Sequence, residues 1–413
     1  MQSVWKSSEA RLNRQWVLGS IVLLVFSTMF AAAFLIDSSE SPIFWLIGVS
    51  FGITVQRSRF CFTSAFRDLF LMGQTRMIKG VFVGLAVSTV GFVMVMSTVS
   101  PNPEFGLPPS DANILPVGLS TLVAGTLFGI GMVLAGGCVS GSLYRMGEGY
   151  IGSWIAILGV MIGLFALNST WNWWWDNLIS TESAIWLPAE ISYTWALVAT
   201  CAALVVLLYI SVLRERRLTT GLVMPEIRKK NDPASPGTSK EFLGYLTALF
   251  QREWSPIVGG VVLGILNILL FIRFHPLGVV GEISRWSISI ANIAGLPELD
   301  LKGMEELGAC ALVIVEGPWL THGLFLNTGI VIGSAASSIF SGEFKLRVPR
   351  STIRYIQSLV GGGIMGYGAG LGLGCTLGAF FSAVPSLALS GWVYAVGLTV
   401  GAYIGVQWIK KFP

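Results

Sequence analysis

Charged side chains are scarce in this chain. Lys, Arg, Asp and Glu make up 12% of its 413 residues, against about a quarter in an ordinary soluble domain. Apolar residues account for 53%, which is typical of a membrane protein. The alternating strands of a β-barrel would not give the long apolar runs seen here. The composition therefore predicts an all-α polytopic membrane protein.

Apolar runs of about 20 residues, the length that crosses a bilayer as a helix, predict the membrane-spanning segments. They are 17–36, 80–99, 116–135, 151–170, 192–213, 255–274, 319–341, 353–373 and 391–409. The first run follows Lys6, Arg11 and Arg14, so a signal peptide is the alternative. Its apolar region exceeds the roughly 7–15 residues of a signal peptide, which favours a retained helix.

Three loops, 37–42, 100–114 and 171–191, contain no Lys or Arg. The basic residues gather instead in 1–14, 67–79, 214–252, 345–354 and 410–411. By the positive-inside rule these basic segments are cytoplasmic, which predicts an inner-membrane protein with both termini inside. The net charge of +4 follows from this bias and does not indicate nucleic-acid binding.

Cysteine and histidine are few, and their spacing excludes several functions. The five cysteines are Cys61, Cys138, Cys201, Cys310 and Cys375, and none forms a CxxC pair. A disulfide framework or a zinc site is therefore not expected, and no cofactor is predicted. Cys201 fits a small buried residue, and nothing supports a role for Cys310. His275 and His322 sit at segment ends, where they do not suggest a proton relay.

The chain contains two halves that resemble each other. When 122–141 is laid over 359–378, many glycines coincide and Cys138 meets Cys375. A second, weaker match brings Arg59 onto Arg285. Because Lys and Arg flank corresponding helices at opposite ends, the halves have opposite orientation, as in the inverted repeats of secondary transporters.

This repeat predicts the domain organisation. The segments are 1–42 (basic terminus and first helix), 43–191 (first transport repeat), 192–254 (extra helix and polar cytoplasmic linker) and 255–413 (second transport repeat).

Two Gly-rich stretches, 135–142 and 372–379, interrupt the helical pattern at corresponding places. Each looks like a helix that stops at mid-membrane, turns on glycine and begins a second half-helix, giving a broken, re-entrant element. Irregular backbone is tolerated at that depth only where it lines a cavity or is buried in protein. Half-helices that begin after Cys138 and Cys375 would direct free N–H groups at the midplane, which predicts an anion site. Gly137, Ser140, Gly374 and Thr376 complete the predicted lining.

The thiols suggest which anion this is. A thiol is a weak donor and a soft, polarisable group, so it suits a sulfur or selenium anion better than phosphate, which arginine normally clamps. The alternative is that the cysteines are small residues that allow close helix packing. Gly362, Gly366, Gly370 and Gly374 recur every four residues, and such ridges usually mark helix contacts.

Arg57, Arg59 and Arg285 lie beside apolar stretches, where an arginine is costly and usually faces a cavity or a partner. Arg59 and Arg285 could attract the anion at opposite ends of its path. The alternative is a structural ion pair, for example with Glu282, and both interpretations stay open. Arg67 beside Asp68 is expected to form an interfacial ion pair.

These motifs resemble the YeeE/YedE family of bacterial membrane proteins. The resemblance rests on Arg59–Asp68, Ala135–Cys138, Gly372–Cys375 and Arg347–Arg350, and it covers most of 43–409. It implies transport of a sulfur compound: thiosulfate in one branch and a suspected selenium role in longer members. It also implies that Cys61, Cys138 and Cys375 pass the ion along by S–H hydrogen bonds, and that a small cytosolic carrier of the TusA type is a possible partner. The expected contacts are thus a small sulfur anion and membrane lipid.

Three other functions remain as alternatives to a thiosulfate permease. A selenium-compound permease would share the same architecture. A membrane thiol enzyme would need a nearby histidine or a resolving cysteine, and the sequence offers neither. A soft-metal channel would be expected to add Met or His at helical spacing around the cysteines.

Overall fold

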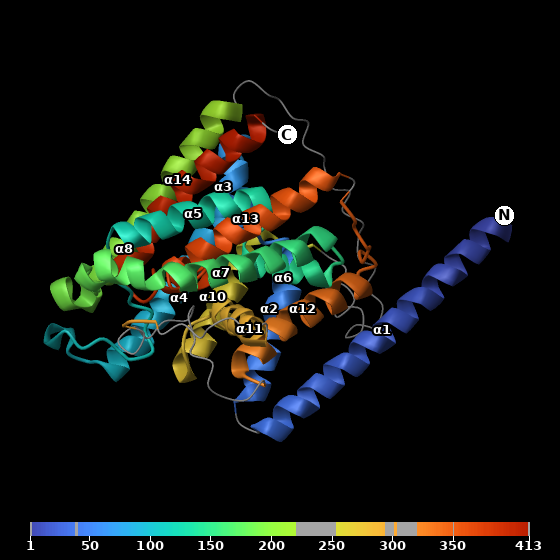
Figure 1. Ribbon diagram of the computed structural model, residues 1–413, viewed down its shortest axis with the longest axis horizontal. Coiled ribbons are helices and arrows are strands. Elements are labelled where there is room, and N and C mark those ends of the chain that lie inside the picture. Colours follow the sequence, from blue (N-terminus) through green and yellow to red (C-terminus); the bar gives the residue numbers. More distant parts are fainter. Residues whose placement is uncertain are drawn as a thin grey trace, which may run out of the picture.

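The computed structural model describes residues 2–37, 40–219, 253–293, 301–303, 320–349 and 351–411, without the side chains of 2–18 and 216–219. The described residues form helices joined mostly by short connections (Figure 1). The longer helices are α1 (Gln2–Ile36), α2 (Ser41–Ser58), α4 (Arg76–Val99), α5 (Leu119–Ala135), α7 (Ile151–Asn177), α8 (Leu187–Thr219), α10 (Pro256–Arg273), α11 (Val280–Ile293), α12 (His322–Phe340), α13 (Thr352–Leu371) and α14 (Leu389–Lys411). The shorter ones are α3 (Phe62–Leu71), η1 (Pro103–Phe105), α6 (Val139–Gly147), η2 (Ile179–Thr181) and the π-helical turn η3 (Thr376–Ser382).

All nine predicted apolar runs coincide with helices, which confirms the all-α fold class. In the part of the chain that the structure describes, 8 helices are long and apolar enough to cross a membrane. The number rises to 9 when α13 and η3 are counted as one bent span. The protein is therefore a multi-pass membrane protein.

Helix α2 did not stand out in the sequence. Its 18 residues include several polar ones, and it is not among the candidate spans. Most of its residues are nevertheless buried, including Thr54, Gln56 and Arg57. Because α2 packs against α12 and α10 rather than against lipid, it does not need a uniformly apolar surface. Hydropathy therefore missed it.

The bundle is built from long helix pairs that join the first half of the chain to the second. Helix α5 packs along α14, and α7 packs along α13. In the same way α2 packs along α12, and α4 along α10. Further contacts join α5 to α13 and α2 to α10 (Figure 1). The core thus lies between the halves rather than within either one.

Glycines allow these pairs to approach closely, as the α7–α13 pair illustrates. A β-carbon on Gly159 would overlap the Leu359 carbonyl, and one on Gly362 would overlap the carbonyl of Ala156. Gly366 and Gly370 also face α7, so the predicted packing role of this ridge is confirmed for these three α13 glycines. Gly374 instead contacts Ala379 in the turn that follows. Small residues give helices in a membrane the close contact that hydrophobicity alone cannot provide there.

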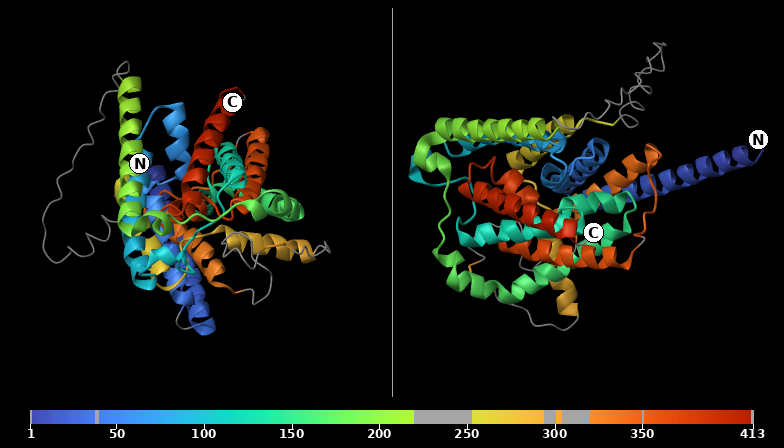
Figure 2. Two further views of the ribbon diagram at one scale, coloured as in Figure 1. Left: turned by 90° about the vertical axis from the view of Figure 1, so that its left-hand side faces the viewer. Right: turned by 90° about the horizontal axis from the view of Figure 1, so that it is seen from above.

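Helices α1 and α8 lie at the periphery of the bundle (Figure 2). Only 11% of the apolar membrane-spanning stretch of α1, and 22% of that of α8, is buried inside the protein. Both helices belong to segments expected outside the repeats. Cys310, most of the polar linker and most of 294–318 fall outside the described residues.

Candidate functional site

The first predicted break lies between α5 and α6. Helix α5 ends at Ala135, and Gly136 follows with a positive φ of 77°, a conformation that glycine adopts without strain. Cys138 is extended and caps α6, where its Sγ accepts a hydrogen bond from the Gly141 N–H at 3.3 Å. The thiol thus takes the position that Ser or Asp usually occupies at a helix start.

The second break lies between α13 and η3 and is sharper. Cys375 is extended at the start of the π-helical turn, and the two helix axes differ by 47°. Leu373 has a φ of 50°, which is uncommon for a leucine and marks local backbone strain. Both predicted interruptions of the helical pattern are therefore present. Only the second bends strongly. Helices α5 and α6, on either side of the first break, together form one candidate span, Leu119–Gly147.

Cys61 occupies the same kind of position as the other two cysteines. It is extended, it lies directly before α3, and its side chain is buried, as are those of Cys138 and Cys375. Arg59, two residues earlier, ends α2 in the left-handed conformation. Each of the three cysteines implicated by sequence therefore sits where a short helix begins, although they are far apart in the chain.

The structure brings these positions together around Gly141. A β-carbon on this glycine would lie 3.1 Å from the Sγ of Cys138 and 3.7 Å from the Sγ of Cys61. The Thr376 hydroxyl, next to Cys375 in the chain, lies beside the Cys138 thiol. Tyr394 of α14 is within electrostatic range of both Cys138 and Cys375. The second half of the chain thus completes the surroundings of a cysteine from the first.

Several buried hydroxyl groups at this place have no hydrogen-bond partner among the described residues. They belong to Thr63, Thr376, Ser390 and Tyr394. A buried polar atom without a partner lowers the stability of the fold by about 1–3 kcal/mol and calls for an explanation. A ligand that binds there would supply the missing partner. Thr63 and Thr376 lie within two residues of Cys61 and Cys375, so polar donors accompany the thiols in both halves.

A polar cavity of about 420 Å³ opens near Cys61 and Cys138. Its basic lining residues are Arg59, Arg145, Lys345 and Arg347. Its acidic lining residues are Asp68, Glu148 and Glu343. We call this cavity the basic vestibule, because its four cations outnumber its three carboxylates.

Arg145 connects the basic vestibule to the first break. One of its guanidinium nitrogens donates a hydrogen bond to the carbonyl of Gly136, and Nε donates to the Tyr144 hydroxyl at 3.3 Å. The arginine thereby satisfies a carbonyl that the end of α5 leaves free. Glu148 lies in the same cavity, where burial raises the pKa of its carboxyl although Gln56, Arg145 and Arg347 oppose this shift.

Two further pockets lie beside the second break and around 106–114 and 183–190. A small pocket lined by Ser120, Thr121, Ser390 and Tyr394 abuts Gly372 and Leu373. A larger cavity of about 630 Å³ is lined by 106–114 and 183–190. Leu115 and Pro116, which line the small pocket, directly follow residues of the larger one. The small pocket therefore lies beside the second break, and residues next in the chain to its lining line the larger cavity.

The two predicted path arginines have different surroundings. Arg59 lines the basic vestibule and forms ion pairs with Glu343 at 3.3 Å and Glu253 at 3.4 Å. Arg285 is buried on α11 and pairs with Glu282 one turn away at 3.5 Å. Glu282 also accepts hydrogen bonds from Trp286 and Thr321. These contacts agree with the alternative, structural interpretation of Arg285.

The other predicted lining residues stay close to the breaks. Ser140 Oγ lies 3.4 Å from Cys138 Sγ, and Gly137 lies beside Ser142 and Arg145. Gly374 precedes Cys375 and packs against Ala379. The expected interfacial pair of Arg67 with Asp68 is confirmed at 2.9 Å.

A sequence profile described as sulphur transport matches residues 57–404. The chain belongs to the sulphur-transport family. The YeeE/YedE resemblance inferred from the cysteine motifs is thereby confirmed, since the match includes all three of those motifs.

Two thiosulfate transporters resemble this chain over nearly their whole length, and a third relative resembles it over less than half. The thiosulfate transporter TsuA of Spirochaeta thermophila is 29% identical over 368 residues, which cover 88% of this chain and 97% of the relative. The thiosulfate transporter TsuA of Escherichia coli is 28% identical over 362 residues, or 87% of this chain and 91% of the relative. The probable transporter YedE of Escherichia coli is 36% identical over 183 residues, 44% of this chain and 41% of that protein. These names agree with a transporter rather than an enzyme.

Several residues at the site were not predicted from the sequence. Thr63 lies inside the motif that contains Cys61, so the sequence pattern could have indicated it. For Arg145, nothing in the sequence shows that the side chain turns back to Gly136. Tyr394 had no local signal, since only helix packing brings α14 to the cysteines.

Proposed function

We propose that this protein takes up thiosulfate across the inner membrane along a path lined by Cys61, Cys138 and Cys375. The observation that carries the proposal is the cluster of buried thiols and unpartnered hydroxyls, which the basic vestibule and the pocket beside Tyr394 flank. The substrate is suggested by the two TsuA relatives, which align over most of their length.

The chemistry of the site fits this anion. The terminal sulfur of thiosulfate is large and polarisable, and S–H groups are soft, weak donors. The hydroxyls of Thr63, Thr376 and Tyr394 offer the oxygen atoms of the anion stronger hydrogen bonds. Because S–H groups are weak donors, binding between the thiols stays weak enough for the ion to leave.

We propose that the two transport repeats, 43–191 and 255–413, are related as an inverted repeat. The helix pairing supports this. The sequence match lays α5 over α13, and taking α7 with α14 as counterparts makes the α5–α14 and α13–α7 pairs equivalent. Taking α2 with α10 and α4 with α12 as counterparts makes the α2–α12 and α10–α4 pairs equivalent too. The two broken elements then come from corresponding places near one axis, as in other transporters of this kind.

We propose that α2 crosses the membrane in addition to the 9 candidate spans, which gives an even number of crossings. Its 18 residues fall within the range of about 17–25 that spans a bilayer. An even number is what a chain with both termini in the cytoplasm requires, as the Lys and Arg distribution predicts.

Cysteine labelling on either side of α4 tests this orientation. Gln74 and Asn102 are exposed and flank this span. With the native cysteines replaced by alanine, an impermeant thiol reagent added outside should modify Asn102→Cys and leave Gln74→Cys unmodified. The reverse pattern would contradict both the orientation and the direction assigned to each repeat.

Arginine substitutions test the basic vestibule. We expect Arg59→Ala to lower the initial uptake rate about two- to fivefold, the range for an exposed charge, and Arg67→Ala to lower it less. Both arginines form ion pairs, but Arg59 lines the vestibule and Arg67 is not among its lining residues. The difference should shrink at high salt, because salt screens exposed charges. Equal losses at every salt concentration would make Arg59 a structural residue.

Uptake by the purified protein in liposomes tests the function itself. We expect saturable uptake of labelled thiosulfate, with unlabelled sulfate, sulfite or selenite competing poorly at equal concentration. Growth of a sulfur-auxotrophic host on thiosulfate should depend on the intact protein. Preferential uptake of selenite or sulfate would replace thiosulfate as the substrate. The TusA-like carrier and the lipid contacts remain predictions.

A further inference from the structure

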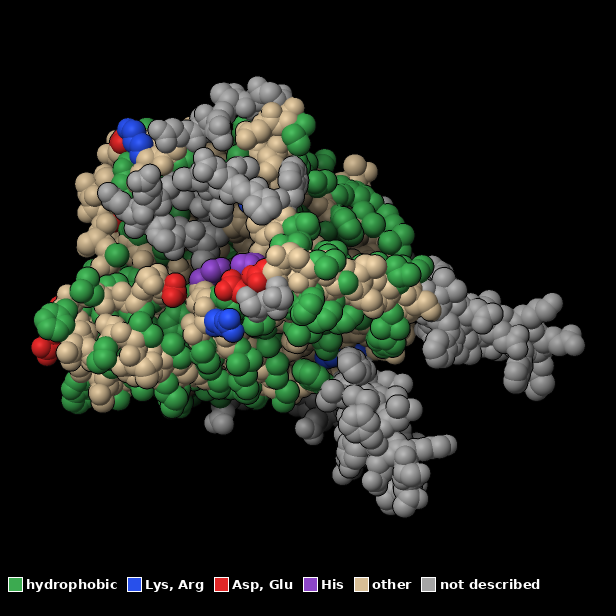
Figure 3. All heavy atoms as spheres, turned by 90° about the horizontal axis from the view of Figure 1, so that it is seen from below, with side chains coloured by type: hydrophobic (Ala, Val, Ile, Leu, Met, Phe, Trp, Pro, Cys, Tyr) green, Lys and Arg blue, Asp and Glu red, His purple; other side chains and the backbone are tan. Residues whose placement is uncertain are grey.

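The two histidines of the chain come together on one face of the molecule. His275 and His322 lie side by side in Figure 3, with acidic side chains next to them. Both rings contact Phe44 of α2, at centroid distances of 5.8 Å for His275 and 4.9 Å for His322. This cluster takes no part in the proposed thiosulfate path.

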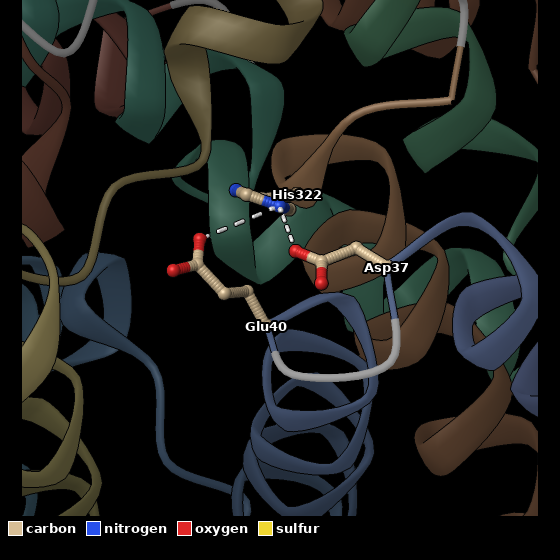
Figure 4. Close-up of side chains that lie close together, drawn as sticks. All are labelled: Asp37, Glu40 and His322. Atoms are coloured by element: carbon tan, nitrogen blue, oxygen red, sulfur yellow. Dashed lines mark ion pairs between the residues drawn. The ribbon is translucent and has the colours of Figure 1, made fainter.

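Three ligand groups converge at His322. Its Nε2 lies 3.8 Å from an oxygen of Asp37 and 3.8 Å from an oxygen of Glu40 (Figure 4). The three ligand atoms all lie within 4.8 Å of one another. These separations exceed the roughly 2.7–3.2 Å of a hydrogen bond. They are close to the approximately 3.3–3.5 Å between atoms that share a tetrahedral ion at usual zinc distances, so small side-chain rotations would close the site.

The backbone fixes the direction from which each ligand comes. Asp37 directly follows α1 and its N–H donates to the Ala33 carbonyl, while Glu40 directly precedes α2 and its carbonyl accepts from Ile43 and Phe44. His322 is the first residue of α12, and its ring is stacked on Phe44 with an interplanar angle of 7°. Three helix ends thus hold the ligands, which reduces the ordering that binding would cost.

The chemistry of this donor set favours a divalent cation of the zinc class. Two carboxylates supply two negative charges, and a neutral imidazole supplies the nitrogen that zinc and its neighbours prefer over calcium and magnesium. Two carboxylates and one histidine leave a fourth position for water, as in open zinc sites. The side chains are 34–40% exposed, so an ion can reach them from solution.

We propose that Asp37, Glu40 and His322 bind one divalent transition-metal ion, which ties the end of α1 to the start of α12. Helix α1 makes few other contacts with the bundle, since only 11% of its apolar membrane-spanning stretch is buried. A bound ion would therefore hold this peripheral helix against the transport bundle. Binding stabilises the bound state in proportion to the logarithm of ion concentration over the dissociation constant.

Calorimetry with Zn²⁺ on the purified full-length protein tests the site. We expect one equivalent to bind, with His322→Ala and the double variant Asp37→Asn/Glu40→Gln each weakening that binding by at least about 100-fold. His275→Ala is the matched control, because this ring contacts the same Phe44 but is not one of the three ligands. It should bind Zn²⁺ like the parent protein.

Co²⁺ absorption separates this site from the thiols. Binding through nitrogen and oxygen should give visible bands without a sulfur charge-transfer band, and these bands should disappear in His322→Ala. Three results would each overturn the proposal. They are the absence of saturable binding at one equivalent, equal affinity in His322→Ala, and an equal loss in His275→Ala.

Discussion

We expect thiosulfate uptake to fall at least about tenfold when either Cys138 or Cys375 is replaced by alanine. This is the largest effect that we expect from a single side chain. Both thiols are buried at the start of a short helix, and Thr376 and Tyr394 accompany them. On the proposed path, removing an S–H group would deprive the anion of a contact at a buried position. A loss of about 1.4 kcal/mol from the transition state for passage is already tenfold in rate. Initial rates in proteoliposomes measure it.

The hydroxyl variants and a fourth cysteine are the controls. Cys138→Ser and Cys375→Ser should also transport poorly, because a hydroxyl is a harder, stronger hydrogen-bonding group that does not match the soft sulfur atom. Cys201→Ala should be close to neutral, since this residue lies on the peripheral helix α8. Full uptake by correctly folded Cys138→Ala and Cys375→Ala would leave the cysteines as packing residues.

Gly141→Ala should block passage between Cys61 and Cys138 while leaving the fold intact. The new methyl group would lie 3.1 Å from the Sγ of Cys138, which is tighter than an ordinary contact, and 3.7 Å from the Sγ of Cys61. It would therefore fill the space that both thiols face. Alanine is favoured over glycine in a helix by roughly 1 kcal/mol, which offsets the small shift that the Cys138 thiol must make, so the thermal stability of this variant should change little. We expect uptake to drop tenfold or more, on the order of the cysteine variants.

Gly152→Ala is the matched control for this effect. Gly152 is also helical, and its added methyl group would meet Ser358 and Pro349 at 3.5 and 3.7 Å, which are ordinary contacts away from the thiols. This variant should transport normally. Normal uptake in Gly141→Ala would show that the anion does not pass between Cys61 and Cys138.

The sequence predicted the long helices and the two interruptions well, for local reasons. A run such as 80–99 is apolar because its surface faces either lipid or the protein interior, so hydropathy alone reveals it. The breaks were visible because glycine and cysteine recur in the same order at Gly137–Cys138 and Gly374–Cys375. The close approach of α7 and α13 followed from glycines at every fourth position.

The remaining parts could not be read locally. Helix α2 is buried among other helices, so its polar residues hid it from any measure of hydropathy. Arg59 and Arg285 are related by the weak repeat, but one lines a cavity and the other pairs with Glu282. That difference depends on which carboxylate each arginine meets after folding.

The sequence by itself determined that this protein is an α-helical membrane protein of the sulphur-transport type, with Cys138 and Cys375 at two local breaks in its pattern and Cys61 in a motif of that family. Composition, helix length and motif order are properties of short segments, and they survive without knowledge of the packing. Only the tertiary structure decided that Cys61 and Cys138 face the same glycine, that Arg145 returns to the break, and that Tyr394 comes within electrostatic range of Cys138 and Cys375. Those contacts join residues that are far apart in the chain, and the packing of helices from both halves creates them.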